Sequence, residues 1–520
     1  VCDTVDDAVS SALLLYRMVK GKAEAREVEV WKQRKRVSLA SSFNEADTQK
    51  IFEHKRELTN YILSKKFVDR LERGCFYQEA FRVFGNRGIT EPIFDILMKT
   101  AERAKLFTKI RVYYALSCFM KEHGITYKGI YDTTLEKLCF SCMQQTVYNE
   151  TRQMFLDNSF CKIEKNEVTI DLPLRVNWAG GWSDTPPYCN ENGGTVLNVA
   201  IKINGYYPVQ VTLRKLPDLC VQFESEDIGI KSTVTNVKEL QNCANPYDGF
   251  AIHKAALIAC GVIPLNEDAV LEKILEKIGG GIYLSTQVLG VPKGSGLGTS
   301  SILAAACVKG IYNFFGMNIS EEKICEIVLC MEQLMSTGGG WQDQVGGLTA
   351  GIKFITSAPG IVQKLNIQKI ILNTKAQREL QNRFVLIYTG QRRLARNLLR
   401  KVVGNYIGGR PETVSILREI QQIAILMKFE LEKGDITAFA KLLNRHWELS
   451  QKLEPGITNT CIDQIVLSIE DMVDGVFIAG GGGFLQAILK KGITKAQVQK
   501  RVYSIFKRSE VKIWDCELLL

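Results

Sequence analysis

Apolar side chains recur three and four residues apart through the first 160 residues of the chain, where glycines are sparse. One such series is Leu13, Tyr16 and Val19, and another is Phe94, Leu97 and Met98. This spacing puts the apolar positions on one face of a helix. The segment 85–90 interrupts the pattern, and Pro92 suits the first turn of a following helix. The pattern predicts a helical region over residues 1–160.

Beyond residue 160 the helical spacing gives way to the alternation of β-strands. Residues 167–172 alternate polar and apolar side chains, and later segments rich in β-branched and aromatic residues continue this pattern. The expected strands are 167–172, 196–203, 207–213 and 281–287, and the expected helices are 250–260, 267–278 and 302–315. Strands mixed with helices in this way favour an α+β fold over a doubly wound sheet.

A second mixed segment begins after about residue 360. The expected elements are a strand at 384–388, helices at 412–433 and 436–449, and a strand at 475–479. Gly434 and Asp435 suit the end of one helix and the start of the next. We therefore expect a helical region, 1–160, followed by two α+β lobes, 161–360 and 361–520.

The composition agrees with a folded globular protein, since 46% of the residues are hydrophobic and 23% are charged. No segment has the roughly 18 apolar residues of a membrane-spanning helix, so a membrane is not an expected partner. The net charge of +10 comes without basic runs interleaved with aromatic residues, so nucleic acid is not expected either. Fifteen scattered cysteines without an export signal predict reduced thiols and a cytoplasmic location. The first residue is Val1 and not Met, which is compatible with a piece of a longer protein.

The most informative segment is a glycine-rich loop that leads into an apolar helix. It consists of Pro292, Lys293, Gly294, Ser295, Gly296, Leu297, Gly298, Thr299, Ser300 and Ser301. Alternate glycines let the backbone approach a ligand closely, and the hydroxyl residues begin the helix where its free N–H groups bind anions. The loop has neither the Gly-Lys-Ser/Thr of a Walker A motif nor the spacing of a dinucleotide fingerprint. It predicts a polyphosphate site, with a tight turn capped by a serine as the alternative.

Two carboxylates further along the chain can complete a site for phosphoryl transfer. Glu332 lies on a helix expected over 324–335, and Asp343 lies among five glycines that predict strained turns. Phosphoryl transfer needs metal ligands near the phosphates and an acceptor for the proton of the alcohol. Ser300 and Glu332 are oxygen donors of the kind that Mg²⁺ prefers, and Asp343 is a candidate base. The alternatives are a solvent-facing helix acid for Glu332 and a loop-capping carboxylate for Asp343.

A turn near residue 180 carries an aromatic residue beside a carboxylate. The segment 175–187 ends a strand in two glycines and then presents Trp182 and Asp184 before two prolines. An indole packs on the C–H face of a sugar, and a carboxylate accepts hydrogen bonds from sugar hydroxyls. The pair predicts a sugar site, with a turn-capping aspartate beside a core tryptophan as the alternative.

A second glycine run follows the strand expected at 475–479. Its members are Gly480, Gly481, Gly482 and Gly483. Four consecutive glycines cost more conformational entropy than a simple loop requires. They predict a close approach of this segment to another loop or to a ligand.

These segments, in this order, resemble the three motifs of the GHMP kinase superfamily, whose members phosphorylate galactose, homoserine, mevalonate and related alcohols. Residues 175–184 are similar to the first motif, 292–301 to the second and 479–484 to the third. The resemblance extends from about residue 165 to the C-terminus. Within the superfamily, the residues 175–187 and 338–344 resemble the L-fucose kinases most closely.

The resemblance implies two α+β lobes with the active site between them. It also implies ATP-dependent phosphorylation of the anomeric hydroxyl of L-fucose, for the salvage route to GDP-fucose. The loop 292–301 would then bind the ATP phosphates, with Ser300 and Glu332 as ligands of Mg²⁺. Asp343 would accept the proton of the sugar, and Arg175 would orient Asp343. The residues implied for the sugar are Trp182, Asp184, Gly340 and Trp341, and the run Gly480–Gly483 would be structural.

Other functions are weighed against this one. Galactokinases place Glu-His where this chain has Gly-Trp at 181–182, which argues against galactose. A heptose 7-phosphate kinase is the first alternative, although its substrate should require basic residues beyond Arg175 in the sugar pocket. A non-enzymatic sensor of ATP or sugar is the second, although it would have little use for a base and metal ligands together. Residues 1–160 match no kinase motif, and both a fused GDP-fucose pyrophosphorylase unit and a helical extension of a stand-alone kinase stay open.

Overall fold

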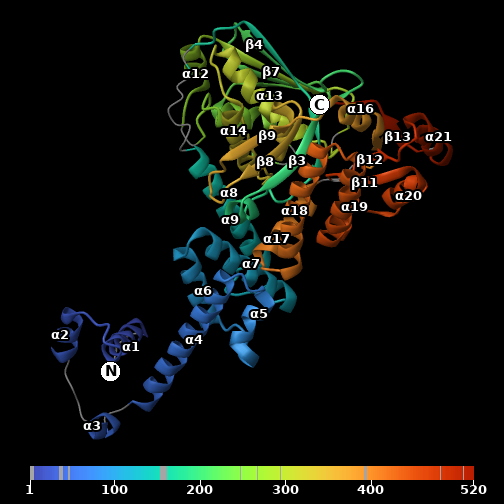
Figure 1. The fold of residues 1–520 in the computed structure, drawn as a ribbon. Coiled ribbons are helices and arrows are strands. Elements are labelled where there is room, and N and C mark those ends of the chain that lie inside the picture. The colour runs from blue at the N-terminus through green and yellow to red at the C-terminus, as the bar shows by residue number, and fades with distance from the viewer. Residues whose placement is uncertain are drawn as a thin grey trace. The chain divides into compact units, whose positions relative to one another are not determined.

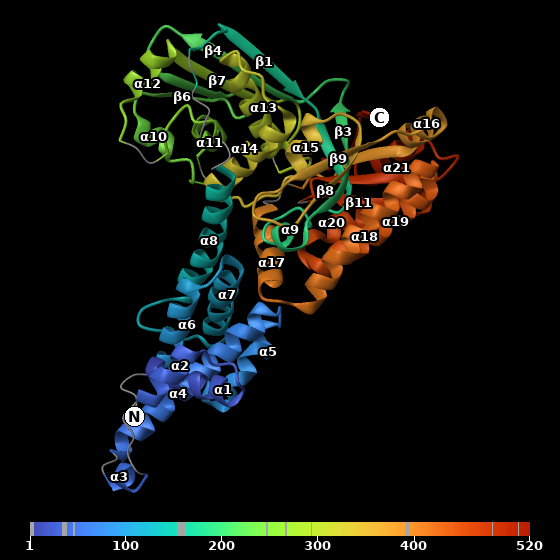
Figure 2. The same cartoon turned by 60° about the vertical axis from the view of Figure 1, so that its left-hand side comes forward.

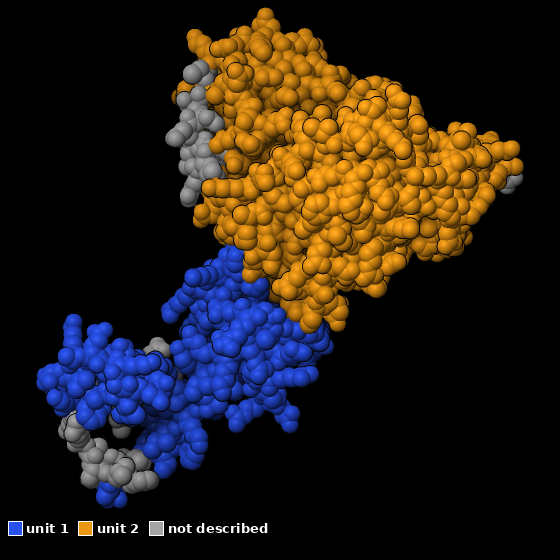
Figure 3. All heavy atoms as spheres, in the orientation of Figure 1, with its two compact units in different colours: residues 1–139 blue, residues 140–520 orange. Residues whose placement is uncertain are grey.

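The computed structural model describes residues 5–33, 39–44, 47–152, 160, 162–245, 248–265, 268–292, 294–391, 395–480, 482–507 and 509–520. The chain divides into two compact units, Val1–Cys139 and Phe140–Leu520, which Figure 3 shows in blue and orange. The boundary between the units falls inside helix α8 (Asp132–Arg152). The domain limits expected at residues 160 and 360 stay predictions.

Unit 1 is helical (Figure 1), as the apolar spacing predicts. Its helices are α1 (Val5–Val19), α2 (Ala25–Gln33), α3 (Leu39–Asn44), α4 (Thr48–Glu72), α5 (Tyr77–Phe81), η1 (Arg82–Arg87), α6 (Glu91–Arg103), α7 (Leu106–His123) and the first part of α8. Pro92 occupies the first turn of α6, and Gly124 ends α7 in a left-handed conformation. The rings of Phe67, Phe81 and Phe84 pack together in the interior.

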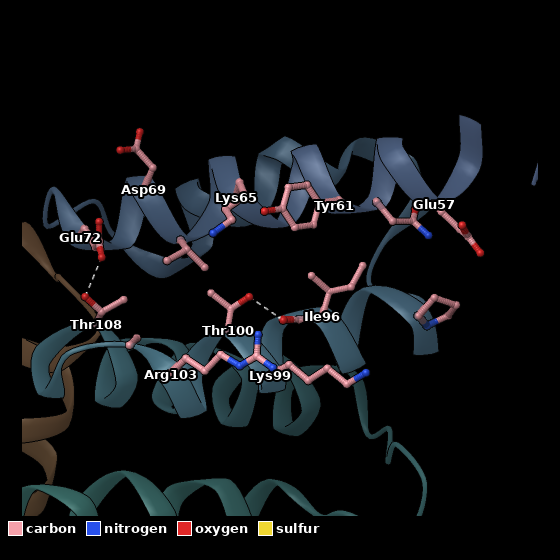
Figure 4. A pocket seen from close by; sticks show the side chains of 14 residues that line it. Glu57, Tyr61, Lys65, Asp69, Glu72, Ile96, Lys99, Thr100, Arg103 and Thr108 are labelled. Atoms are coloured by element: carbon pink, nitrogen blue, oxygen red, sulfur yellow. Dashed lines mark hydrogen bonds between the residues drawn. The ribbon is translucent and has the colours of Figure 1, made fainter. Parts of the chain in front are cut away.

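A hollow of about 680 Å³ lies in unit 1 between α4 and α6. Figure 4 shows the side chains of the two helices that face each other across it. Lys65 and Arg103 contribute positive charge to its walls, and Glu57, Asp69 and Glu72 contribute negative charge. None of the residues predicted for catalysis or phosphate binding lines this hollow.

The first sheet of unit 2 leads directly into the glycine-rich loop. Its strands are β1 (Glu167–Leu172), β4 (Val209–Leu216), β5 (Val221–Ser225), β6 (Ile230–Val234) and β7 (Gly281–Val288), in the order β1-β4-β7-β5-β6. Helix α13 (Thr299–Phe314) packs against β1 and β4, and Figure 2 shows the three elements next to one another. Burial alternates along β1, so its apolar residues face the core as the sequence pattern predicts. The loop therefore lies between the end of β7 and the start of α13.

Two further antiparallel sheets complete the unit. One contains β2 (Leu174–Ala179), β3 (Thr195–Ile203), β8 (Ile352–Ser357), β9 (Leu365–Ile370) and β14 (Cys516–Leu518), and the other contains β10 (Phe384–Tyr388), β11 (Val473–Ala479), β12 (Phe484–Leu489) and β13 (Lys512–Trp514). All six residues of β2 are buried, and this strand carries Arg175. The second glycine run connects β11 to β12.

Helices surround these sheets. They are α9 (Tyr188–Asn192), α10 (Val237–Gln241), α11 (Ala251–Ala259), α12 (Leu271–Ile278), α14 (Glu321–Leu334), α15 (Gln342–Leu348), α16 (Thr374–Arg383), α17 (Ala395–Ile407), α18 (Pro411–Lys433), α19 (Ile436–Leu453), α20 (Thr460–Ile469) and α21 (Lys495–Ile505), with the 3-10 turns η2 (Pro455–Ile457) and η3 (Glu470–Met472). Gly434 ends α18 and Asp435 caps α19, as expected. Within the described part of the chain, no helix is both long and apolar enough to cross a membrane.

The segment around Asp343 agrees in part with the sequence-based expectation. Ser336 and Gly338 have φ angles of 55° and 67° in the turn that precedes it, whereas Asp343 itself lies in the short helix α15. Gly346 and Gly347 lie inside this helix, and an added Cβ on them would lie 2.6 Å from side-chain carbons of Arg175 and Ile302, respectively. The expected turns are therefore present before Asp343, but not at Gly346 and Gly347, which instead allow a helix to pack closely against its neighbours.

Candidate active site

The glycine-rich loop ends at the uncapped start of a long helix. Gly294, Gly296 and Gly298 have φ angles of 72°, 79° and 76°, a left-handed conformation that side chains rarely adopt. Gly298 is the N-cap of α13 and provides no side chain to bond the N–H groups of its first turn. Ser300 in that turn is exposed. Free N–H groups and the helix dipole make this end of α13 favourable for an anion.

The two glycine segments touch backbone to backbone. A Cβ on Gly296 would lie 2.1 Å from the carbonyl oxygen of Ala479, and a Cβ on Gly480 would lie 2.7 Å from Cα of Gly296. Thr389 supports the second run, since its hydroxyl donates to the carbonyl oxygen of Gly482 at 2.5 Å. The predicted close approach of the run to another loop is therefore present in the structure.

Arg175 on β2 and Asp343 on α15 form a hydrogen-bonded ion pair. Oδ1 of Asp343 accepts from Nε of Arg175 at 3.0 Å and from its Nη2 at 2.5 Å, while Nη1 donates to the carbonyl oxygen of Gly296 at 2.9 Å. Among the described residues, Oδ2 of Asp343 has no hydrogen-bond partner, and 26% of the side chain is exposed. A Cβ on Gly298 would lie 3.1 Å from Cγ of Asp343. A carboxylate oxygen is thus available beside the anion site.

Glu332 on α14 is buried and accepts two hydrogen bonds from hydroxyl groups. Its Oε1 accepts from Ser301 at 2.6 Å, and its Oε2 accepts from Thr337. Burial raises the pKa of the Glu332 carboxyl, and these two hydrogen bonds act in the opposite direction. The hydroxyl of Ser301 is thus engaged within the protein, whereas Ser300 is exposed. The sequence pattern had assigned both serines to the phosphate loop.

Asp184 is enclosed by the turn that precedes Asp343. Its Oδ2 accepts from the backbone N–H of Gln342 at 3.1 Å, and its Oδ1 accepts from the side-chain amide of the same residue at 3.0 Å. Gly340 lies so close that an added Cβ would be 2.1 Å from Oδ2 of Asp184. Burial, followed by the negative charge of Asp343, raises the pKa of Asp184 to about 7.

The two tryptophans predicted for the sugar occupy different environments. Trp341 is 1% exposed, and its Cζ2 would lie 2.6 Å from a Cβ added to Gly194. Trp182 is half-buried and has a φ angle of 81°, which is rare for a bulky residue. Trp341 is therefore a core residue behind the turn, whereas Trp182 is partly accessible; contact of either with a sugar stays a prediction.

The raised pKa of Asp184 predicts that stability falls as the pH rises. The carboxyl titrates near 3.8 when exposed and at about 7 in the folded chain, so the folded state binds more protons between these values. Asp184→Asn cannot ionise, and its stability relative to the wild type should improve across this range by up to roughly 4 kcal/mol, at about 1.36 kcal/mol per pKa unit. Urea unfolding of both proteins in a pH series measures the difference, and a difference independent of pH would contradict the prediction.

The structure brings Arg175, Asp343 and the start of α13 into one site. Asp184 is linked to this site by its hydrogen bonds with Gln342, the residue before Asp343. Sequence reasoning gave no role to Gln342, although its position beside the candidate base was a signal. Two members of the predicted loops, Lys293 and Gly481, lie outside the described residues. An anion site beside a carboxylate and a guanidinium can transfer an anionic group to an alcohol.

Comparison with known families agrees with this chemistry. Residues 267–351 match the family described as the GHMP kinases N terminal domain. This range contains the glycine-rich loop, α13, Glu332 and Asp343.

Three relatives each align with about two thirds of this chain. A bifunctional fucokinase/GDP-fucose pyrophosphorylase from Arabidopsis thaliana is 33% identical over 69% of this chain and 33% of its own length. An L-fucokinase/L-fucose-1-P guanylyltransferase from Bacteroides fragilis is 34% identical over 63% of this chain and 35% of its own length. A D-glycero-alpha-D-manno-heptose 7-phosphate kinase from Campylobacter jejuni is 26% identical over 67% of this chain and 98% of its own length. The chain thus spans about a third of the length of the two bifunctional relatives.

Solved structures share the fold of about two thirds of the chain. The mevalonate kinase of Methanococcus jannaschii aligns with a TM-score of 0.50 and 17% identity, over 68% of this chain and 99% of its own. The galactokinase of Lactococcus lactis, complexed with galactose, aligns with a TM-score of 0.50 and 14% identity, over 72% of this chain and 98% of its own. The α+β architecture after the helical region is therefore that of these kinases.

Proposed function

Because this chain carries the N-terminal domain of the GHMP kinases and belongs to that family, we propose that it is an ATP-dependent sugar kinase that phosphorylates the anomeric hydroxyl of L-fucose. The observation that carries the proposal is the pair of Arg175 and Asp343 beside the uncapped start of α13. The pair supplies a proton acceptor at the place where the loop can bind phosphate. The product is L-fucose 1-phosphate, the compound used in the salvage route to GDP-fucose.

The geometry of the ion pair supports a direct transfer. The anomeric hydroxyl gives its proton to Oδ2 of Asp343, its oxygen forms a bond to the γ-phosphorus, and the bond between that phosphorus and the bridging oxygen breaks to release ADP. Arg175 fixes Oδ1 and leaves Oδ2 for the proton. The N–H groups of the loop and of α13 stabilise the charge on the phosphoryl group.

We propose that the surroundings of the loop hold the nucleoside of ATP. A hollow of about 490 Å³ is lined by residues 287–292 together with Asp227 and Ile228, so it adjoins the first residue of the loop. We assign this hollow to the nucleoside and the loop itself to the phosphates. The turns at Gly294, Gly296 and Gly298 let the main chain approach the phosphates closely.

Magnesium is the metal expected with ATP, and the oxygen donors at the site suit it. Ser300 presents an exposed hydroxyl at the first turn of α13, and Glu332 supplies a buried carboxylate next to Ser301. A bound cation would favour the ionised form of this carboxyl, whose pKa burial raises. We propose that Ser300 and Glu332 are the protein ligands of Mg²⁺, which neutralises phosphate charge when it is bound.

L-Fucose is favoured over other sugars by the two relatives at 33% and 34% identity, whose names state fucokinase activity. The heptose 7-phosphate kinase is the second candidate because the chain covers 98% of its length, at a lower identity of 26%. We further propose that the chain corresponds to the kinase part of a bifunctional protein, fused to or associated with a GDP-fucose pyrophosphorylase unit.

A panel of acceptors tests the proposed function. ADP release with Mg-ATP would be followed for L-fucose, D-arabinose, D-galactose and a heptose 7-phosphate. We expect kcat/KM for L-fucose to exceed that for each other acceptor by at least about 10-fold, because a site built around sugar hydroxyls discriminates through its hydrogen bonds. A higher value for the heptose phosphate would favour the second candidate, and no ADP release with any acceptor would contradict a kinase.

A further inference from the structure

The side-chain oxygens of Asp184 are both bonded to one neighbouring residue. Both of its oxygens accept hydrogen bonds from Gln342, one from the main chain and one from the side chain. The nitrogen of the Gln342 side-chain amide faces Asp184, since it donates to Oδ1 at 3.0 Å. The amide oxygen of Gln342 is then buried without a hydrogen-bond partner among the described residues. An unpaired buried acceptor lowers the stability of the fold, and the chain nevertheless has glutamine at this position.

Gln342 is itself fixed by the strand behind it. The side-chain amide of Asn198 on β3 donates to the main-chain carbonyl oxygen of Gln342 at 3.0 Å, and Asn198 is fully buried. The next residue is Asp343, whose Oδ1 is bonded to Arg175. Gln342, which directly precedes the candidate base in the chain, thus holds the predicted sugar carboxylate through two hydrogen bonds.

The remaining residues of the turn support the same contact. Gly340 has no side chain, which allows Asp184 to approach its Cα. Trp341 fills the core against Gly194 and so fixes the turn from behind. Each residue of the sequence Gly-Trp-Gln-Asp at 340–343 thus has a contact that explains its type. Gln342 is the one that donates hydrogen bonds to Asp184.

We propose that Gln342 is a positioning residue for sugar recognition: its two hydrogen bonds hold the Asp184 carboxyl, which is 1% exposed, against the turn that leads into Asp343, so that this turn places the base at the anomeric oxygen of the sugar. This inference rests on the proposed function of the site. Gln342 acts through Asp184 and makes no contact with the phosphates. Its loss should weaken binding of the sugar and leave binding of ATP unchanged.

Gln342→Met tests this role because it keeps the main-chain N–H and the length of the side chain but removes the amide. We expect KM for L-fucose to rise by about 10-fold to 100-fold, as for a lost hydrogen bond to a charged group, with kcat changed less and KM for ATP unchanged. The matched control is Gln363→Met, which removes a buried amide that donates to the carbonyl oxygen of Gly360 and whose Oε1 is likewise without a partner in the described structure. The control should retain both KM values.

A double-mutant cycle with Asp184→Asn separates this role from a general loss of stability. If Gln342 acts through Asp184, Gln342→Met should change kcat/KM in the Asp184→Asn background by less than about 3-fold, because the partner is already lost. Equal losses of kcat/KM in both backgrounds, or an unchanged KM for L-fucose in Gln342→Met, would overturn the inference about Gln342. The proposed function would still stand in that case, provided that the wild-type protein phosphorylates L-fucose. A wild-type chain that phosphorylates no sugar would overturn the proposed function and this inference together.

Discussion

Replacing Asp343 by Asn should lower kcat by at least about 10²-fold, the range expected when a general base is lost. The carboxamide keeps the shape of the side chain and an oxygen that accepts from Arg175, but it offers no basic oxygen in the place of Oδ2. Binding of ATP should change little, since the loop and the start of α13 are unaltered. Single-turnover kinetics and equilibrium binding of an ATP analogue would measure the two quantities separately.

Unit 2 contains a matched control for this substitution. Asp474 on β11 forms a similar pair with a buried arginine, Arg383, with 2.6 Å between Oδ2 and Nη2. Asp474→Asn should lower stability and leave kcat of the folded protein within about 3-fold of the wild type, because it is outside the site that transfers the phosphoryl group. Unchanged turnover in Asp343→Asn would remove this residue from the role of the base.

Arg175→Lys should lower kcat by about 10²-fold, although the positive charge is retained. The guanidinium donates to two groups in different directions, the Asp343 carboxylate and the carbonyl oxygen of Gly296. A lysine ammonium lacks this planar arrangement of donors, and each hydrogen bond to a charged group contributes roughly 1.5–3 kcal/mol. The measurement is kcat at saturating ATP and sugar.

Arg383→Lys provides the control for the arginine. Arg383 is as buried as Arg175 and also donates to both a carboxylate and a carbonyl oxygen, at Asp474 and Leu489. Both variants should lose stability, and only Arg175→Lys should lose turnover. Equal activity of the two variants would show that the link between Arg175 and Asp343 does not matter for the reaction.

The sequence was sufficient for much of the fold because the relevant signals are local. The alternation at 167–172 and the glycine after α18 each depend on neighbouring residues, and both elements lie where they were expected. The glycine-rich loop was equally recognisable, since left-handed turns at alternate positions require glycine.

The site itself depends on contacts between distant parts of the chain, which spacing does not encode. The glycines near Asp343 predicted strain, whereas Gly346 is needed because the side chain of Arg175 lies against it. Ser301 was assigned to phosphate with its neighbours, but its hydroxyl donates to Glu332, 31 positions away. Asp184 was predicted to bind the sugar, while its two hydrogen bonds with Gln342 appear only when the two segments are brought together.

The backbone contact between Gly296 and Gly480 constrains how these two positions can vary. Where two side chains meet, one can become smaller as the other becomes larger, and the interface survives. Glycine has nothing left to remove, so a methyl group gained at either position has no compensating change at the other. A larger residue at either position can therefore be accommodated only if the main chain of one of the two loops shifts.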